Sequence, residues 1–263
     1  QREQLEMTIR DLEGRRMQLE EVRQEYAEYA AKQYDFELNG IYYKKLSESE
    51  VAVTRKDEGH KNGNTYVGDL VLPASINKEG VEYKVTSIRA NAFERCWKLT
   101  SLVIPEGVTE IGDFAFSGCV ALKSVKFPDS LHKFGVCAFF GCLALSSIDI
   151  PEGTKKISDK CFYGCSSLTS VRLSSTINSI EKDAFAKCYN LFNVYYMGTE
   201  EEYKAVTIGE GNDRLKVAAV YFEHIHVYDD KATVSVGDCV IKGREIYTCR
   251  CSDSYNEFKY GAH

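Results

Sequence analysis

The sequence lacks a long apolar run, an excess of basic residues and the motifs of the common enzyme classes. Within its 263 residues no stretch of about 18 apolar ones occurs, so we expect no segment that spans a membrane. Basic side chains number 33 and acidic ones 39, which gives a net charge of −6. This balance argues against nucleic acid as a partner, because phosphate binding needs a basic surface.

Catalytic motifs are missing as well. The chain has no G-x-S-x-G, no H-E-x-x-H, no Walker loop and no glycine-rich dinucleotide fingerprint after a strand. A cysteine and a histidine can form a nucleophilic pair, and the candidates are His132 near Cys137, and His224 and His226 near the C-terminal thiols. We therefore expect no enzyme and no catalytic residue, with a thiol or metal-assisted hydrolase as a minor alternative.

What the sequence has instead is a 23-residue pattern that occurs five times within 85–196. Such a unit is too small to bury its own apolar face, so stacked units must share one core, and the pattern predicts a solenoid. Four registers recur at steps of 23 without a slip: Ile88, Ile111, Phe134, Ile157 and Ile180; Phe93, Phe116, Phe139, Phe162 and Phe185; Cys96, Cys119, Cys142, Cys165 and Cys188; Leu99, Leu122, Leu145, Leu168 and Leu191.

Each unit ends in a segment typical of a strand. Leu99 to Ile104 reads L-x-x-L-x-I, whose last residues alternate inward and outward, and Pro105, Pro128 and Pro151 close three of the units. We expect one strand per repeat, with consecutive strands side by side in a parallel sheet about 4.8 Å apart. The V-x-x-I-x-x-x-A-F segment then forms the opposite wall, and the fold class is an α/β-type solenoid that is mostly β.

These residues carry a family resemblance. The patterns C-x-x-L-x-x-V-x-I-P and V-x-x-I-x-x-x-A-F-x-x-C over about 85–196 resemble the BspA-type leucine-rich repeat of bacterial and protist surface proteins. The resemblance implies a non-catalytic scaffold for binding or adhesion, located at the cell surface or secreted. The implied partner is a protein or glycan at a cell surface, and the family has no common catalytic residue to transfer.

The segments on either side of the repeats differ from them in pattern. Residues 1–33 have apolar side chains seven apart, which predicts an amphipathic helix. This helix would form a coiled-coil homo-oligomer, pack on the next domain or be an added handle. Residues 34–84 alternate with period two and predict a β-rich N-terminal cap with an inserted hairpin. In 197–222 we expect a C-terminal cap that opens with a capping box at Thr199.

Residues 223–263 form a separate small β module in this interpretation. Its order of histidines and cysteines resembles small modules appended to large bacterial cell-surface proteins. Such side chains are ligands that zinc prefers, but the C-x-C spacing departs from the usual C-x-x-C. A module without metal, a structural zinc site and a reactive thiol pair stay open, and otherwise no cofactor is expected. The candidate ligands are His226, Cys239, Cys249, Cys251 and His263.

Five of the ten cysteines occupy one repeat register and are therefore expected to point inward. A buried cysteine can act as a small apolar filler, and five thiols in a row cannot pair evenly. Cys137 and Cys161 lie outside the register on adjacent repeats, so a bridge between them is a candidate. A row of reduced thiols suits a reducing or anaerobic setting.

The solvent-facing positions of the repeat strands are the candidate binding site. One register changes its side chain in every copy, as expected where packing makes no demand: Val103, Lys126, Asp149, Arg172 and Tyr195. Arg and Tyr are favoured anchors at interfaces, although cross-strand salt bridges among the three charged residues would also satisfy this row without a partner. The neighbouring register is uniform and suggests a structural hydroxyl ladder: Ser101, Ser124, Ser147, Ser170 and Asn193.

Overall fold

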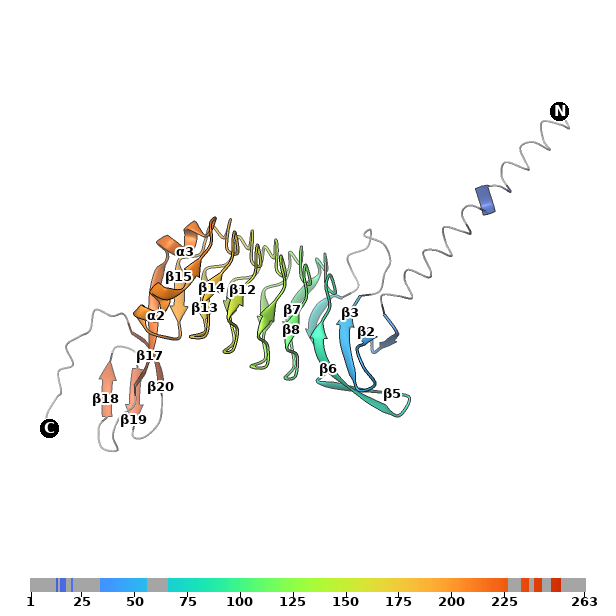
Figure 1. The fold of residues 1–263 in the computed structure, drawn as a ribbon, viewed down its shortest axis with the longest axis horizontal. Helices are drawn as coiled ribbons and strands as arrows, with labels where there is room; N and C mark the ends of the chain where they lie inside the picture. Colours follow the sequence, from blue (N-terminus) through green and yellow to red (C-terminus); the bar gives the residue numbers. More distant parts are fainter. Residues whose placement is uncertain are drawn as a thin grey trace, which may run out of the picture.

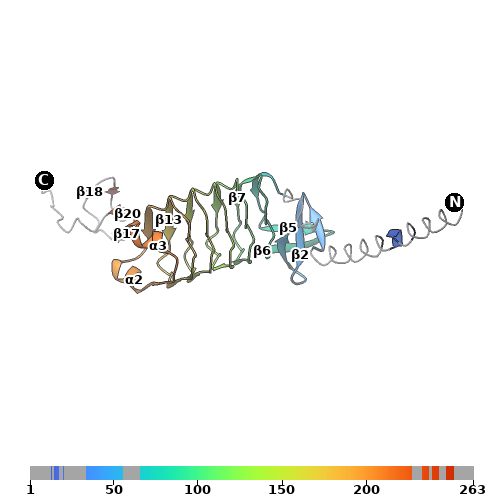
Figure 2. The same ribbon diagram turned by 90° about the horizontal axis from the view of Figure 1, so that it is seen from above.

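The computed structural model describes part of the chain. The described residues are 13, 15–17, 20, 34–55, 66–226, 233–236, 239–242 and 247–251, with side chains only up to residue 222. Together, 34–55 and 66–226 form an elongated solenoid whose short strands lie side by side along its long axis (Figure 1). Seen from above, successive coils follow one another as a row of ribs (Figure 2).

One wall of the solenoid carries the predicted parallel strands. Outward-facing residues alternate with buried ones along these strands, and the expected parallel sheet is confirmed. The strands are β4 (Gly68–Val71), β7 (Leu99–Val103), β9 (Ser124–Lys126), β11 (Ser147–Asp149), β13 (Ser170–Leu173), β15 (Asn193–Tyr196) and β17 (Ala219–His226).

The opposite wall is also a parallel sheet, so the expectation of one strand per repeat was wrong. Each unit has a second strand, two residues long in all but the first unit, because the V-x-x-I segment places a half-buried or exposed residue before a buried one, as in Glu110 and Ile111. This wall contains β6 (Val81–Ile88), β8 (Glu110–Ile111), β10 (Lys133–Phe134), β12 (Lys156–Ile157), β14 (Ser179–Ile180) and β16 (Thr207–Ile208).

Tight turns, not helices, connect the second wall back to the first. In every repeat, φ is positive at two of the turn positions, two residues before and two residues after the register phenylalanine. The later position is glycine in three repeats, at Gly118, Gly141 and Gly164, because glycine adopts this conformation without steric cost. This geometry keeps the repeats almost wholly β.

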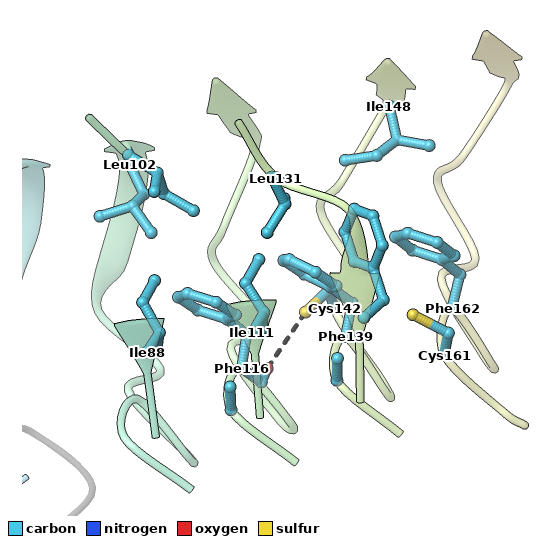
Figure 3. Close-up of a cluster of buried hydrophobic side chains, with 14 of the residues drawn as sticks. Ile88, Leu102, Ile111, Phe116, Leu131, Phe139, Cys142, Ile148, Cys161 and Phe162 are labelled. Atoms are coloured by element: carbon cyan, nitrogen blue, oxygen red, sulfur yellow. Dashed lines mark hydrogen bonds between the residues drawn. The ribbon is translucent and has the colours of Figure 1, made fainter. Parts of the chain in front are cut away.

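The core between the walls is a column of stacked phenylalanines. The register rings from Phe93 to Phe185 have centroids 4.8 to 5.3 Å apart and planes within 15° of each other. This separation follows the strand spacing of about 4.8 Å, so each ring packs on its counterpart in the next coil. Figure 3 shows Phe116, Phe139 and Phe162 in this column, surrounded by the aliphatic residues of both walls.

The register cysteines also lie in the core, as expected, and they do more than fill space. The Cys142 thiol donates a hydrogen bond to the carbonyl oxygen of Phe116, one repeat earlier, with an S···O distance of 3.2 Å (Figure 3). Cys119, Cys165 and Cys188 repeat this bond to the preceding phenylalanine at 3.0 to 3.3 Å. All seven cysteines whose side chains are described are buried thiols, so Cys137 and Cys161 form no bridge.

The N-terminal cap extends the second wall. Strands β1 (Phe36–Leu38), β2 (Ile41–Lys45) and β3 (Glu50–Thr54) continue that sheet in the order β1-β2-β3-β6. The predicted inserted hairpin is β5 (Ser75–Lys78) paired antiparallel with β6, and it turns through Glu79 and Gly80, both with positive φ. The period-two pattern of this region therefore predicted its β-strands correctly.

The C-terminal end is closed by two short helices. Helix α2 (Glu200–Ala205) starts at the predicted capping box, in which Thr199 and Glu202 bond reciprocally. Helix α3 (Asp213–Val217) was not expected, and before it the buried amide of Asn212 takes the place of a further repeat. Its Oδ1 accepts the N–H of Phe185 at 2.8 Å, while its Nδ2 donates to the carbonyls of Glu181 and Gly209.

Each wall is interrupted, the first wall between the second and third repeats and the second wall between the third and fourth. The hydrogen-bonded ladders stop at β9 and β10 and resume at β11 and β12. Near these breaks, Phe127 and Phe134 occupy registers that hold smaller aliphatic side chains in most other repeats. Their ring centroids lie 5.1 Å apart. Across the gap the Ser158 hydroxyl donates to the Phe134 carbonyl at 2.6 Å, where other repeats use a backbone N–H.

Two predicted segments lie largely outside the described residues. Of 1–33, only Glu13, 15–17 and Glu20 are described, and they are helical and exposed, so a helix over the whole segment stays a prediction. Of 223–263, the backbone of β18 (Thr233–Val236), β19 (Cys239–Lys242) and β20 (Tyr247–Cys251) is described. Strand β20 pairs antiparallel with β17 and so joins the repeat sheet. Among the described helices, none is long and apolar enough to cross a bilayer.

Replacing Asn212 should open the C-terminal end of the core. We expect Asn212→Ala to lower the free energy of unfolding by about 2–4 kcal/mol, because the buried Phe185 N–H loses its acceptor and the partly buried carbonyls of Glu181 and Gly209 each lose a donor. Urea unfolding followed by circular dichroism measures the change. The control is Asn190→Ala, which removes one exposed bond to the Ser166 carbonyl and should cost less than about 1 kcal/mol. Equal losses for both variants would contradict the capping role.

The hydrogen bond from the Ser158 hydroxyl to the Phe134 carbonyl, which bridges the break in the second wall, can be tested separately. We expect Ser158→Ala to cost about 1–3 kcal/mol, because the buried Phe134 carbonyl is left without its donor. Ser124→Ala, on the exposed face, should stay within about 0.5 kcal/mol of wild type. Thermal unfolding compares the two, and a Ser158→Ala protein as stable as Ser124→Ala would show that the gap does not depend on this bond.

Candidate binding surface on the repeat sheet

The first wall brings the predicted site residues into one row on its outer face. The strand register pairs Val103 with Lys126, and it pairs Arg172 with both Asp149 and Tyr195. Strands β9 and β11 are neighbours without a hydrogen-bonded ladder, so the row passes over the interruption between Lys126 and Asp149. All five side chains are exposed or half-buried.

The row is longer than the repeat count predicts. Val71 of β4 pairs with Val103, and Tyr221 of β17 pairs with Tyr195, so each extends the row by one strand. Sequence reasoning missed both because Val71 precedes Val103 by 32 residues and Tyr221 follows Tyr195 by 26 residues, not by 23. The segment from Asp69 to Pro73 resembles the V-x-I-P sequence that ends a repeat strand, and this similarity is the sequence signal that points to Val71.

Local contacts hold the C-terminal half of this row. The Arg172 Nε–H group donates to the sulfur of Met197 at 2.9 Å, which orients the guanidinium. The rings of Tyr195 and Tyr221 stack with centroids 5.2 Å apart and planes 22° apart. In the part of the chain that the structure describes, no ion pair joins Lys126 to Asp149, so the expected salt bridge between these two is not formed.

The uniform serine register lies beside this row on the same face. No hydrogen bond joins one of these hydroxyls to the next over the described strands, so the expected hydroxyl ladder is not found. Instead, Asp69 of β4 accepts bonds from the hydroxyls of Ser101 at 2.6 Å and Thr100 at 2.7 Å. These two donors lower the pKa of the Asp69 carboxyl from its usual value and keep it ionised at neutral pH.

The chemistry of the face changes along the solenoid axis. The row begins with two valines, continues through Lys126, Asp149 and Arg172, and ends with two stacked tyrosines. The surface is an exposed sheet without a nucleophile beside a base, and it is suited to contact with an extended surface. Over the residues whose side chains are described, no group of three histidine, cysteine or acidic side chains is placed to hold a metal ion.

The structure describes one of the two alternative sites that were predicted from cysteine and histidine residues. His132 is exposed, with Nδ1 3.1 Å from the Ser130 carbonyl, whereas Cys137 is buried and its pKa is raised by burial and by Asp159. Such a thiol is held protonated, the opposite of an activated nucleophile. The side chains of the proposed zinc ligands lie outside the described residues, and that site stays a prediction: His226, Cys239, Cys249, Cys251 and His263.

Comparison with known families agrees with the repeat geometry. Residues 86–205 match the BspA type leucine rich repeat region. The match contains six copies, whereas the sequence has five full periods followed by the cap. The repeats are therefore of the kind that the sequence pattern indicated, and the family model covers the central part of the chain. The sequence has no significant match among curated proteins.

A solved structure, that of the Faecalibacterium protein below, has the same fold. A leucine rich cell surface protein from Faecalibacterium prausnitzii is 29% identical with a TM-score of 0.57, over 65% of this chain and 41% of that protein. A leucine-rich repeat protein from Bacteroides capillosus is also 29% identical, with a TM-score of 0.44, over 52% of this chain and 95% of that protein. This chain thus spans about two fifths of the Faecalibacterium protein.

Burial of the register thiols predicts low reactivity. Burial raises the pKa of Cys119 and Cys165, so the thiolate fraction at pH 8 falls and alkylation slows, in addition to the steric block. We expect both to stay unmodified in native protein treated with iodoacetamide and to react fully in urea, as measured by peptide-mapping mass spectrometry. Native labelling as fast as in urea would show that the core is open.

Proposed function

We propose that the chain is a non-catalytic binding scaffold that recognises a protein or glycan through the outer face of the first wall. The supporting observation is the row from Val71 to Tyr221, where the side chain passes from valine through lysine, aspartate and arginine to tyrosine while the backbone keeps the same strand geometry. Positions inside the core repeat because packing fixes them. Core packing does not restrict the side chains in this row, so their differences can serve to recognise a partner.

The chemical gradient along the row suggests how a partner is held. Arg172 and the tyrosines combine large contact area with directional hydrogen bonding, the combination that dominates binding energy at interfaces. Because Met197 orients Arg172 and Tyr221 stacks on Tyr195, less side-chain entropy is lost when a partner binds. The aromatic and charged half of the row, from Asp149 to Tyr221, is therefore the proposed anchor.

Location at a cell surface is part of the same proposal. It is supported by the repeat type and by the similarity to the Faecalibacterium protein, which is described as a cell surface protein. Residues 1–33 remain the basis of the alternative, a spacer or assembly protein that oligomerises through its N-terminal helix. That alternative has only the seven-residue apolar spacing in its favour.

The proposal predicts that changes on the face abolish partner capture. The full chain is immobilised and exposed to surface extracts of host and bacterial cells, and a glycan array separates sugar from protein partners. We expect the combined alanine variant at Lys126, Asp149, Arg172 and Tyr195 to lose at least about tenfold in affinity, a loss of about 1.4 kcal/mol or more.

A matched variant controls for general effects of lost charge. Lys133, Lys156 and Lys182 are exposed away from the face, the first two on strands of the opposite wall, and their combined alanine variant should capture the partner as wild type does. Equal capture by the face variant and wild type, or no capture by wild type, would count against the proposal. In that case, lost oligomerisation after removal of 1–33 would favour the assembly role.

A further inference from the structure

The two walls of the solenoid end at different places at the N-terminal end. The second wall continues beyond β6 through β3, β2 and β1, whereas the first wall ends one strand beyond β7, at β4. Strands β3 and β4 each lie next to a strand of the first repeat, so they correspond across the core. In the described part of the chain, β1 and β2 therefore have no counterpart on the first wall.

An open groove lies where the missing strand would be. Its volume is about 580 Å³, within the range of ligand pockets, roughly 300–1,000 Å³. Leu38, Ile41 and Tyr43 of the overhanging sheet line one side, Leu70 and Val71 of β4 line the other, and β5 contributes the end wall. Apolar side chains such as Ile41 and Leu70 line the groove together with the polar residues Asn39, Ser75 and Asn77, and Val71 is 67% exposed.

The backbone of β4 offers unused hydrogen-bonding groups to this groove. The N–H groups of Gly68 and Leu72 donate to the first repeat, at 2.8 and 3.0 Å. Successive residues of a strand point their N–H and C=O groups to opposite edges, so those of Asp69 and Val71 point away from β7. Neither residue has a backbone hydrogen-bond partner among the described residues, which leaves a free strand edge.

We infer that this groove binds an extended peptide segment of a protein partner, which adds to β4 as a further strand. Donors and acceptors at every second residue match a peptide backbone and not a sugar or a lipid, and the added strand makes main-chain bonds while its side chains enter pockets. Asn39 of the β1–β2 turn and residues of β5 also line the groove, and its volume of about 580 Å³ suits one short extended segment and not the sheet of a second solenoid.

The groove also specifies the side chains of its occupant. Alternate residues of the added strand face Ile41 and Tyr43, so they should be apolar, whereas the others lie on the outer face beside Asp69 and Val71. The ionised Asp69 carboxylate favours a lysine or arginine at the residue beside it. Because Val71 belongs both to the groove and to the candidate face, the bound peptide would lengthen that face by one strand.

A repeat strand of the chain itself serves as the probe. The peptide KLTSLVIP, residues 98–105, is the sequence of a strand that pairs parallel with the next strand along the solenoid. In the chain, the Ile104 N–H donates to the following strand and the Val103 carbonyl accepts from the preceding one. A second peptide, N-methylated at the positions of Leu102 and Ile104, therefore lacks the donors that would face β4.

Binding of the labelled peptides to the full chain is measured by fluorescence anisotropy. We expect saturable binding of the unmodified peptide below about 1 mM and at least about tenfold weaker binding of the N-methylated one. Val71→Pro should weaken binding by a similar factor, because it removes an edge N–H that the fold does not use, and proline is tolerated on edge strands. Val71→Thr keeps that donor and should bind as wild type does.

Hydrogen exchange gives a readout that does not depend on the proline variant. The backbone amides of Asp69 and Val71, which point away from β7, should exchange more slowly when the peptide is present. Amides already protected without peptide would show that the chain's own residues cover the edge, and this would overturn the inference, as would absence of binding at about 1 mM or equal binding by Val71→Pro and Val71→Thr.

The same assay separates this groove from the proposed binding face. The combined alanine variant at Lys126, Asp149, Arg172 and Tyr195 leaves β4 intact and should bind the peptide with wild-type affinity. Loss of peptide binding in that variant would overturn the groove as an independent site, whereas failure of partner capture with peptide binding retained would count only against the face.

Discussion

Every repeat depends on the backbone groups of its neighbours, and this mutual dependence organises the whole molecule. A register phenylalanine such as Phe139 donates its N–H to the Cys161 carbonyl in the next coil, and its own carbonyl accepts the thiol of Cys165. No unit can satisfy these groups alone, because its hydrogen-bond partners belong to the next copy. Stacking of the rings then adds dispersion contacts along the same axis.

The same dependence explains why the two ends are built differently. At the C-terminal end, Asn212 supplies with one side chain the acceptor that a sixth coil would provide from its backbone. At the N-terminal end the second wall is covered by β1, β2 and β3, but β4 leaves the edge of the first wall open. One end of the sheet is thus closed by a helical cap and by β20, and the other has a groove beside an unpaired strand.

The repeat registers were enough to predict the solenoid, the parallel sheet, the buried cysteines and the place of the candidate row. They failed where the structure departs from strict repetition. The second strand is only two residues long in all but the first unit, too short for an alternating pattern, and Val71 and Tyr221 lie behind insertions that break the 23-residue step. The role of Asn212 depends on contacts with Glu181 and Gly209 that no local pattern encodes.

A cap that consists of one amide also bears on how such a chain changes over generations. Because Asn212 accepts the N–H of the last register phenylalanine, a group that every coil presents, the array does not need a new terminus when its number of coils changes. A gene duplication or deletion of one whole 23-residue unit would bring equivalent groups to the same amide. Length can therefore vary in whole units, and the reach of the surface with it, without a new solution for the end of the core.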